Sequence, residues 1–368
     1  MNCMSDVVFC LVIGPAFLRA LARYRRLLEV RWERSPAPLA LGAVVALLVL
    51  TVPAAAVAAT PAQRAERYLV RAQNTDGGFG VAPRSASSPL YTGWAGLGLA
   101  AAGRNPHAVR RSGGRSIAAY LRRGAPALRD IGEIERTALL AIAAGLDPRN
   151  LGGKNLLAEI ARRRRSNGSI SNFVSYTAFG IMALKAGGEQ AGGSAIRWLT
   201  GSQNEDGGFG VARSSASDSD MTGAALQALC AVGRRNGATA RRAVEWLVQN
   251  QNDDGGYGQF RGRPSNSQST AYAVQGLIAA RAGGAAIERA RAYLVRLQRG
   301  NGSVAYSSSS AQTPVWVTAQ ALMALEGKAL PFRAVPRKQR RRAGASANDG
   351  EASGGGAAAG GSGSAGRG

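Results

Sequence analysis

The chain has 368 residues, a formal net charge of +24 and a single histidine, His107. Such a charge suggests an acidic partner, but the sequence shows no recognisable nucleic-acid motif and no interleaving of basic with aromatic residues. Only four of the 46 basic residues are Lys, so the arginine excess is typical of a general compositional bias. We therefore expect no nucleic-acid partner, and either a solvated surface or a general affinity for anionic cell-surface polymers or lipid headgroups.

The first predicted element is an export signal. An apolar run over 38–59 follows Arg31 and Arg34, and the small residues Ala56 and Ala58 form a cleavage-site pattern. The run is also nearly long enough to span a bilayer, so an uncleaved anchor is the alternative. We interpret 1–59 as an N-terminal extension plus a signal peptide or signal anchor. The protein is then expected to be secreted or extracytoplasmic, with an N-terminal membrane anchor if the run is not cleaved.

One sequence element then recurs along the chain, an aromatic residue and Leu followed by the spacing x3-Gln-x3-Gly-x-aromatic. It marks the end of a predicted helix, because apolar residues precede it at helical spacing and a Gly pair stops the helix. Three copies are nearly identical, a fourth ends in Val304, and a degenerate copy over 160–170 has Ile170 in place of the aromatic residue. The defining side chains of the good copies are Gln73, Phe79, Gln203, Phe209, Gln251, Tyr257 and Gln298.

Each copy is followed by a Ser-rich stretch and a second apolar helix that aligns on a threonine. A Thr just inside a helix start, preceded by Ser, Asp or Asn, fits capping chemistry. The alignment defines six helix pairs, over 61–103, 104–146, 150–187, 192–233, 237–282 and 285–327. The aligned residues are Thr92, Thr137, Thr177, Thr222, Thr270 and Thr318.

The six pairs are expected to close into a ring rather than to form an open solenoid. Neither end has a polar capping repeat, and the first and last repeats are as apolar as the middle ones. The Ala- and Gly-rich second helices suit a crowded inner ring, and the bulkier first helices suit an outer one. We place this domain at 60–328. The remaining segment, 329–368, begins with a basic run and becomes almost pure Gly, Ser and Ala, which predicts a disordered tail.

The recurring element resembles the QW repeat of squalene–hopene and oxidosqualene cyclases, which the β subunits of protein prenyltransferases share more loosely. The resemblance covers 61–327 and implies an all-α fold, the α/α toroid (α6/α6 barrel) of the terpenoid cyclase superfamily. In that family the Gln and the terminal aromatic residue brace neighbouring outer helices. The resemblance therefore implies a structural role for the Gln and aromatic residues of the repeats here.

The resemblance does not fix an activity, because this fold carries several. Protein prenyltransferases bind zinc through Asp, Cys and His, whereas this chain has only His107 and, behind the expected cleavage site, only Cys230. We therefore expect no metal site and no cofactor. Class II terpene cyclases protonate their substrate with the middle Asp of Asp-x-Asp-Asp. The matching stretch here places Asp220 at the general-acid position, but Met221 replaces an acidic neighbour.

Two carboxylate pairs precede aligned threonines. Glu133 and Glu135 stand before Thr137 as Asp218 and Asp220 stand before Thr222, so a closed ring would bring both pairs to one mouth. They are either helix N-terminal acids that complement the macrodipole or a site for a cation, a cationic ligand or catalysis. Three aromatic residues two positions after an aligned threonine are expected in the same cavity, Trp94, Phe179 and Tyr272.

Three functions remain open. The preferred one is an exported, non-catalytic toroid that binds a ligand or a partner, which the single ring, the missing zinc set and Met221 favour. The second is a class II cyclase-like enzyme that acts on an isoprenoid with Asp220 as proton donor, and the third is a structural cell-surface domain. The expected partner is a hydrophobic small molecule or a cell-envelope component, with membrane association through 38–59 and a monomeric protein.

Overall fold

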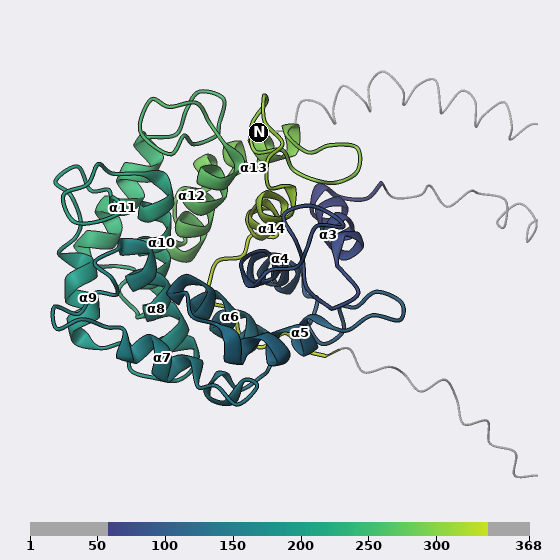
Figure 1. The fold of residues 1–368 in the computed structure, drawn as a ribbon. Coiled ribbons are helices and arrows are strands. Elements are labelled where there is room, and N and C mark those ends of the chain that lie inside the picture. Colours follow the sequence, from purple (N-terminus) through teal and green to yellow (C-terminus); the bar gives the residue numbers. More distant parts are fainter. Residues whose placement is uncertain (1–57, 338–368) are drawn as a thin grey trace, which may run out of the picture. The chain divides into compact units, whose positions relative to one another are not determined.

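A computed structural model describes residues 58–337, which form a closed ring of helices (Figure 1). Within this range the chain is helical and forms no β-strand. The outer helices are α3 (Pro61–Ala72), α5 (Ile117–Gly124), α7 (Leu156–Arg162), α9 (Gly193–Thr200), α11 (Ala238–Gln249) and α13 (Gly284–Arg296). The inner helices are α4 (Pro89–Ala101), α6 (Ile131–Ala143), α8 (Val174–Ala186), α10 (Ser219–Ala231), α12 (Ser267–Ala280) and α14 (Pro314–Leu325). Two short 3-10 helices, η1 (Ala125–Ala127) and η2 (Pro148–Asn150), lie in the connections.

The two layers differ because their helices differ in how much of their surface is apolar. Outer helix α3 begins with a capping box between Thr60 and Gln63 and buries one stripe at helical spacing, which includes Tyr68 and Leu69. Inner helix α4 is buried all round from Thr92 to its end. A helix that is apolar on every side is stable only when it is enclosed, so the second helix of each pair lines the ring. The all-α toroid predicted from the repeats is confirmed.

The ring closes between the first and sixth helix pairs. Inner helix α14 packs against α4 as well as against α12, and α14 also contacts α3. The side chain of Gln298 donates to the carbonyl of Pro61 at 2.8 Å, which joins the end of α13 to the start of α3. The backbone N–H of Val315 donates to the carbonyl of Val81 across the same seam. The junction between the first and sixth pairs therefore has the same kinds of contact as the junctions between the other helix pairs.

The glutamines of the repeat tie each outer helix to the next one. In the fourth repeat, Nε2 of Gln203 donates to the carbonyl of Gly207 in its own turn and to the carbonyl of Thr239 at the start of α11. The carbonyl of Gly207 accepts no backbone N–H in the turn, so the glutamine supplies its partner. Gln73, Gln251 and Gln298 make the equivalent pair of bonds, and the terminal aromatic side chains Phe79, Phe209 and Tyr257 are fully buried.

The aligned threonines do not cap the inner helices. Capping falls to residues four positions earlier, such as Ser88, Asp218 and Asn266. In five repeats the threonine hydroxyl instead accepts a hydrogen bond from the backbone N–H of the residue that ends the repeat element, at 2.9 Å in each case, as between Thr222 and Phe209. Thr137 has no such bond, because the second repeat lacks the Gln-Gly portion of the element.

Backbones approach closely in the inner ring, as its Ala- and Gly-rich composition predicts. A Cβ atom on Gly276 of α12 would lie 2.9 Å from the Cα of Gly223 on α10, and one on Gly223 would lie 2.3 Å from the carbonyl oxygen of Tyr272. Any larger residue at either position would force these two helices apart.

The segment after α14 corrects the predicted domain boundary at 328. Its first residues cross the ring, as the yellow segment of Figure 1 shows. They pack against the ring and are therefore not part of the predicted tail. Leu330 is buried, and its N–H donates to Oε1 of Gln227 on α10. The N–H of Val335 donates to the carbonyl of Ala143 at the end of α6. The apolar side chains of this stretch, which alternate with prolines and arginines, contact the core. The basic and Gly-rich composition of the residues that follow did not predict this contact.

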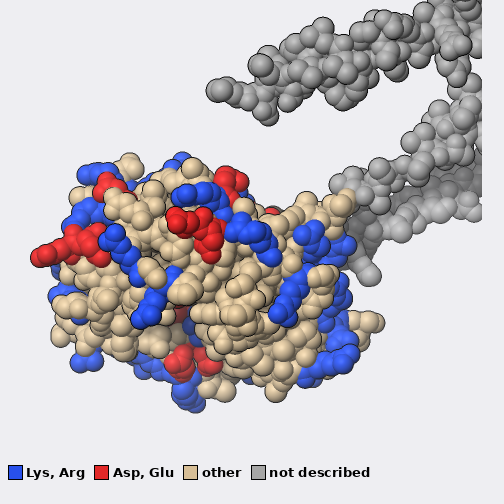
Figure 2. Space-filling model, turned by 90° about the horizontal axis from the view of Figure 1, so that it is seen from above, with Lys and Arg blue, Asp and Glu red and all other residues tan. Residues whose placement is uncertain are grey.

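The predicted signal or anchor over 38–59 and the tail beyond 337 lie almost entirely outside the described residues. No helix within 58–337 has the length and apolar character needed to cross a membrane. On the face drawn in Figure 2, the Lys and Arg side chains are spread over the surface with Asp and Glu among them.

Candidate functional site

The centre of the ring is occupied by an aromatic cluster. Trp94 of α4 stacks on Trp316 of α14, with ring centroids 6.0 Å apart and an interplanar angle of 14°. It also meets Phe179 of α8 and Tyr272 of α12 edge-on, at 5.8 and 6.1 Å. The three aromatic residues expected in one cavity thus come together, and Trp316 joins them. Trp94 and Phe179 are buried, whereas Tyr272 and Trp316 remain partly accessible.

Arg136 of α6 reaches this cluster, although the sequence analysis did not single it out. Its guanidinium carbon lies 5.8 Å from the Trp94 ring centroid, within the range of a cation–π contact. Its Nε is buried without a hydrogen-bond partner, and within residues 58–337 it forms no ion pair. The available signal was its distance from the start of the helix: Arg136 lies six residues after the capping Asp130, as Trp94 lies six residues after Ser88.

Asp220 sits in the first turn of α10, on the side of the ring where the inner helices begin. Burial raises the pKa of its carboxyl to about 6, against a hydrogen bond from Ser269 of α12 that lowers it. Its Oδ1 is buried without a partner. The carboxyl is also close enough to raise the pKa of Tyr272, which places it beside the aromatic cluster.

Asp218 has a structural position. It is the N-cap of α10, where its Oδ1 accepts a hydrogen bond from the N–H of Met221 at 2.8 Å. Its pKa is raised to about 7, chiefly by burial and to a smaller extent by the charge of Asp220, while the cap bond from the N–H of Met221 opposes the shift. The helix-end interpretation therefore accounts for Asp218 and leaves Asp220 without a structural partner for its Oδ1.

The expectation that Glu133 and Glu135 share a mouth with the aspartates is wrong for Glu135. Its Oε1 lies between α6 and α8, 3.2 Å from where a Cβ on Gly180 would stand and next to Ile160 of outer helix α7. Burial there raises the pKa of Glu135 well above its usual range. Glu133 is half-buried in the first turn of α6, and burial and Asp130 raise its pKa. Arg136, and not Glu135, reaches the centre because it lies six residues after the N-cap Asp130, as Tyr272 lies six residues after the N-cap Asn266.

Gln320 of α14 completes the central group. It is fully buried, its Oε1 accepts from Gln268 of α12 at 3.1 Å, and its Nε2 has no partner. Burial raises the pKa of Tyr272, which belongs to the same group. The buried polar atoms of the centre that lack a partner are Nε1 of Trp94, Nε1 of Trp316, Nε of Arg136, Nε2 of Gln320 and Oδ1 of Asp220.

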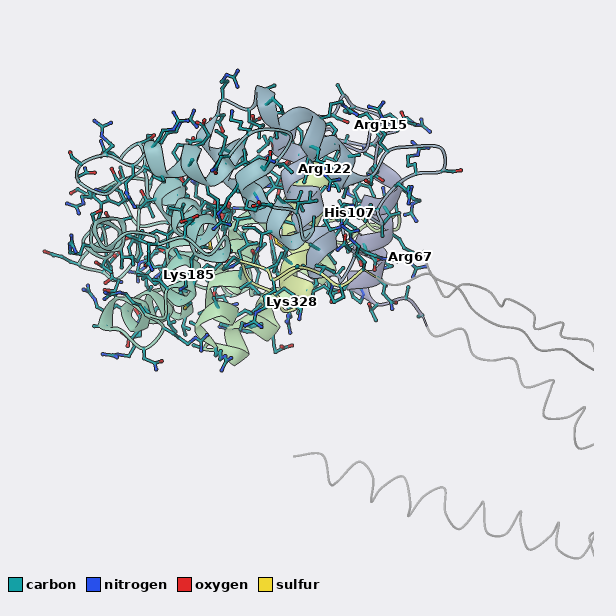
Figure 3. The ribbon with its side chains drawn as sticks, turned by 90° about the horizontal axis from the view of Figure 1, so that it is seen from below. Arg67, His107, Arg115, Arg122, Lys185 and Lys328 are labelled. Carbon is teal, nitrogen blue, oxygen red and sulfur yellow. The ribbon has the colours of Figure 1, made fainter. Side chains whose placement is uncertain are left out.

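The residues considered for zinc lie elsewhere. Nε2 of His107 is 2.8 Å from a guanidinium nitrogen of Arg337, and Figure 3 shows His107 on the same side of the molecule as Arg122. Burial lowers the pKa of His107, and the charges of Arg337 and Arg122 lower it further. Cys230 is half-buried on α10. No group of three His, Cys, Asp or Glu that could hold a metal occurs between residues 58 and 337.

Comparisons with protein families and with solved structures support the toroid fold. The family model of the prenyltransferase alpha-alpha toroid domain matches residues 41–118, 164–274 and 235–325. A glycosidase of known structure is 12% identical with a TM-score of 0.53, over 73% of this chain and 95% of that one. A type II terpene cyclase from Scytonema, in complex with geranylgeranyl dihydroxybenzoate, is 17% identical with a TM-score of 0.52, over 73% and 96%. The sequence matches none of the curated proteins compared with it. At these identities the structures share the fold, and proteins of different activity share it.

Proposed function

The chain belongs to the prenyltransferase alpha-alpha toroid domain family, and from that premise we propose that it is an exported toroid that binds a ligand at the centre of its ring without transforming it. The observation that carries this proposal is the set of five unpartnered polar atoms around one aromatic cluster. A buried polar atom without a partner costs about 1–3 kcal/mol. A ligand that supplies the missing partners and packs on the indole rings would offset that cost.

The state of Asp220 favours binding over catalysis. Protonating a carbon–carbon double bond requires a strong acid, whose conjugate base is stabilised by its neighbours. Burial instead disfavours the conjugate base of Asp220 and raises its pKa to about 6, and Met221 stands where the cyclase pattern has a further Asp. The carboxyl therefore suits a hydrogen-bonding contact better than a proton transfer to an alkene. Its place beside the aromatic cluster, at the general-acid position of the cyclase pattern, keeps the cyclase-like enzyme as the second candidate function.

Native mass spectrometry of the full-length chain tests these functions together. We expect a co-purified small molecule of reproducible mass that leaves when the protein unfolds and that is chemically unchanged after incubation. A product altered by wild type but not by Asp220→Asn would establish the cyclase-like enzyme instead. If nothing co-purifies, and a lipid extract of the source cells gives no shift in melting temperature, the structural-domain interpretation replaces both.

Export is part of the proposal and has its own test. The apolar run over 38–59 and the small residues Ala56 and Ala58 support cleavage, so the mature chain should begin at Ala59 or Thr60. N-terminal sequencing of protein from the medium and from the membrane fraction checks this. Intact chain found only in membranes, with residues before Pro38 attached, would favour the anchor, and intact chain in the cytosol would contradict export.

A further inference from the structure

A surface pocket at the seam between the first and sixth helix pairs is lined by arginines. It has a volume of about 210 Å³ and lies between α3 and the turn over 299–303 that follows α13. Its lining consists of Ala59, Arg64, Arg67, Arg71, Gly300, Asn301 and Gly302. Within residues 58–337 none of the three arginines forms an ion pair, and Glu66, the acid of α3, pairs with Arg104. The pocket therefore has an unbalanced positive charge.

The turn at this pocket lacks a carboxylate that its counterparts have. Asp206 of the fourth repeat caps its own turn through Oδ1, and the charge of Arg242 on the next outer helix stabilises its ionised form. Asn301 makes the same kind of bonds, since its Oδ1 accepts from the N–H and the hydroxyl of Ser303, but it has no charge. The turn at the seam thus keeps its shape without the acid. The three nearly identical copies of the repeat element all have an acid at this position, Asp76, Asp206 and Asp254.

The facing outer helix places an arginine in the same way at both kinds of turn. Arg71 of α3 donates to the carbonyl of Asn301, and Arg296 of α13 donates to the carbonyl of Asp254. The turn at Asp254 contains two carboxylates, with Asp253 as the second, whereas the turn at Asn301 contains none. At the seam the anion that balances the arginines must therefore come from outside the turn.

The degenerate copy of the element loses the acid and the arginines together. Its turn has Asn167 and no acidic residue. The facing helix α9 has Ser194 and Gly201 at the positions where α3 has Arg64 and Arg71. Only at the seam, among these turns of the described chain, is the acid absent while the arginines remain.

Carbonyl oxygens hold the arginines of the pocket in place. A terminal nitrogen of Arg64 donates to the carbonyl of Ala59, and one of Arg71 donates to the carbonyl of Asn301, each at 2.8 Å. Both guanidinium groups keep further N–H groups that have no acceptor within the described range. The backbone N–H groups of Gly300 and Asn301 also donate to no backbone carbonyl there. These donors are oriented and available to a ligand.

An anion with several acceptor oxygens fits such a pocket. Guanidinium groups bind phosphate through paired hydrogen bonds, and the N–H groups of a turn add to the same recognition. We infer that the pocket binds a phosphate group, which takes the place of the missing turn carboxylate. The apolar run over 38–59 directly precedes the pocket, so the group is either a free phosphate or the phosphate of a lipid headgroup. Because its donors come from α3 and from the turn after α13, the phosphate holds the two ends of the ring together.

Two soluble probes identify the source of the phosphate. Inorganic phosphate and glycerophosphoglycerol, a phosphodiester headgroup without acyl chains, are titrated by calorimetry into the full-length chain at constant ionic strength. We expect one saturable site for at least one probe. At ten times its dissociation constant, that probe should raise the melting temperature by about 2–4 °C over chloride. Preference for inorganic phosphate indicates a free ion, and preference for the diester indicates a lipid headgroup. Saturable binding of neither would overturn the inference.

Matched variants locate the site. Arg71→Gln and Arg296→Gln each remove a bond to a turn carbonyl, but only Arg71 lines the pocket. Arg71→Gln should weaken binding of the preferred probe about tenfold, and Arg296→Gln should change it by less than about twofold. Arg67→Gln should also weaken binding, and it breaks no bond across the seam because Arg67 donates to the carbonyl of Gln63 in its own helix. Circular dichroism checks that each variant is folded.

Asn301→Asp restores the carboxylate of the other turns and supplies the decisive variant. It should raise the melting temperature in the absence of phosphate, because the new carboxylate faces the arginines of α3, and it should abolish the shift that phosphate produces. Phosphate binding that persists in Asn301→Asp, or equal losses in Arg71→Gln and Arg296→Gln, would place the bound ion elsewhere and overturn the inference.

Discussion

Asp218 and Asp220 show how burial sets the chemistry of single residues in this ring. Both carboxyls have pKa values raised from 3.8, to about 7 and about 6, chiefly because water is excluded. Folding therefore favours the protonated acids. Their protonation stabilises the fold fully below about pH 4, and this contribution is lost as the pH rises through 6 and 7.

Asp218→Asn and Asp220→Asn should each remove that loss. Relative to wild type, the melting temperature of either variant should be little changed at pH 4 and raised by several degrees at pH 8. Asn caps a helix about as well as Asp, so Asp218→Asn keeps the cap of α10. Thermal melts at half-unit pH steps measure the difference, and a difference that does not vary with pH would contradict the burial argument.

Asp206 provides the control of opposite sign. Its Oδ1 accepts from the N–H of Gly208 and from Ser217, and its Oδ2 accepts from Nε1 of Trp246. These bonds outweigh the effect of partial burial and lower its pKa. The ionised form stabilises the fold above pH 3.8, and that contribution disappears as the pH falls below this value. Asp206→Asn should therefore destabilise the protein at pH 7 and much less near pH 3.

At the scale of the element, each turn is fastened to the inner helix that follows it. The threonine hydroxyl accepts the N–H that ends the turn, and the glutamine carries the link onward to the next outer helix. The threonine satisfies the N–H of Phe209 and the glutamine satisfies the carbonyl of Gly207, two backbone groups of the turn that would otherwise be unpaired. The number of residues between the glutamine, the end of the turn and the threonine must therefore be kept for these bonds to form.

Thr222→Val tests this role. The change keeps the shape of the side chain but leaves the buried N–H of Phe209 without an acceptor, so we expect a loss of about 1–3 kcal/mol in the free energy of unfolding. Thr137→Val should cost clearly less, because Thr137 accepts no such bond. Urea unfolding of both variants measures the two costs. Equal costs would mean that packing of the side chain, and not its hydroxyl, holds the turn.

At the scale of the whole molecule, closure makes the six repeats interdependent. Deleting residues 285–327 removes α13 and α14 and exposes the apolar faces of α12 and α4 at once. Circular dichroism should then show loss of most of the helix and of the cooperative melt. An open array would keep most of its helix after losing a terminal repeat, with a modest shift in melting temperature.

A gentler version of the same test uses two glutamines. Gln298 donates across the seam to Pro61, whereas Gln203 donates within the ring to Thr239, each at 2.8 Å. In a closed ring Gln298→Ala and Gln203→Ala should cost similar amounts, about 1–3 kcal/mol each. A negligible cost for Gln298→Ala beside a clear cost for Gln203→Ala would show that the seam is open in solution.

The sequence by itself determined the ring, because its pattern repeats. The element ending in Phe79, Phe209 and Tyr257 recurs at near-constant spacing, and a pattern that repeats in sequence must repeat in contacts. The same periodicity predicted that Trp94, Phe179 and Tyr272 would meet. Local chemistry also identified Asp218 and Asp220 as acids at the start of one inner helix.

Only the tertiary structure decided what differs between repeats. The alignment on Thr137 placed Glu135 level with Asp220, but Thr137 lies seven residues after the N-cap Asp130, whereas Thr222 lies four residues after Asp218. This offset of three residues brings Arg136, and not Glu135, to the centre. The same holds for the pKa of Asp220 and for the burial of Leu330 beyond the predicted boundary, which depend on groups contributed by other helices. Burial and partners are properties of the closed ring, because each inner helix is surrounded by segments that are distant in the sequence.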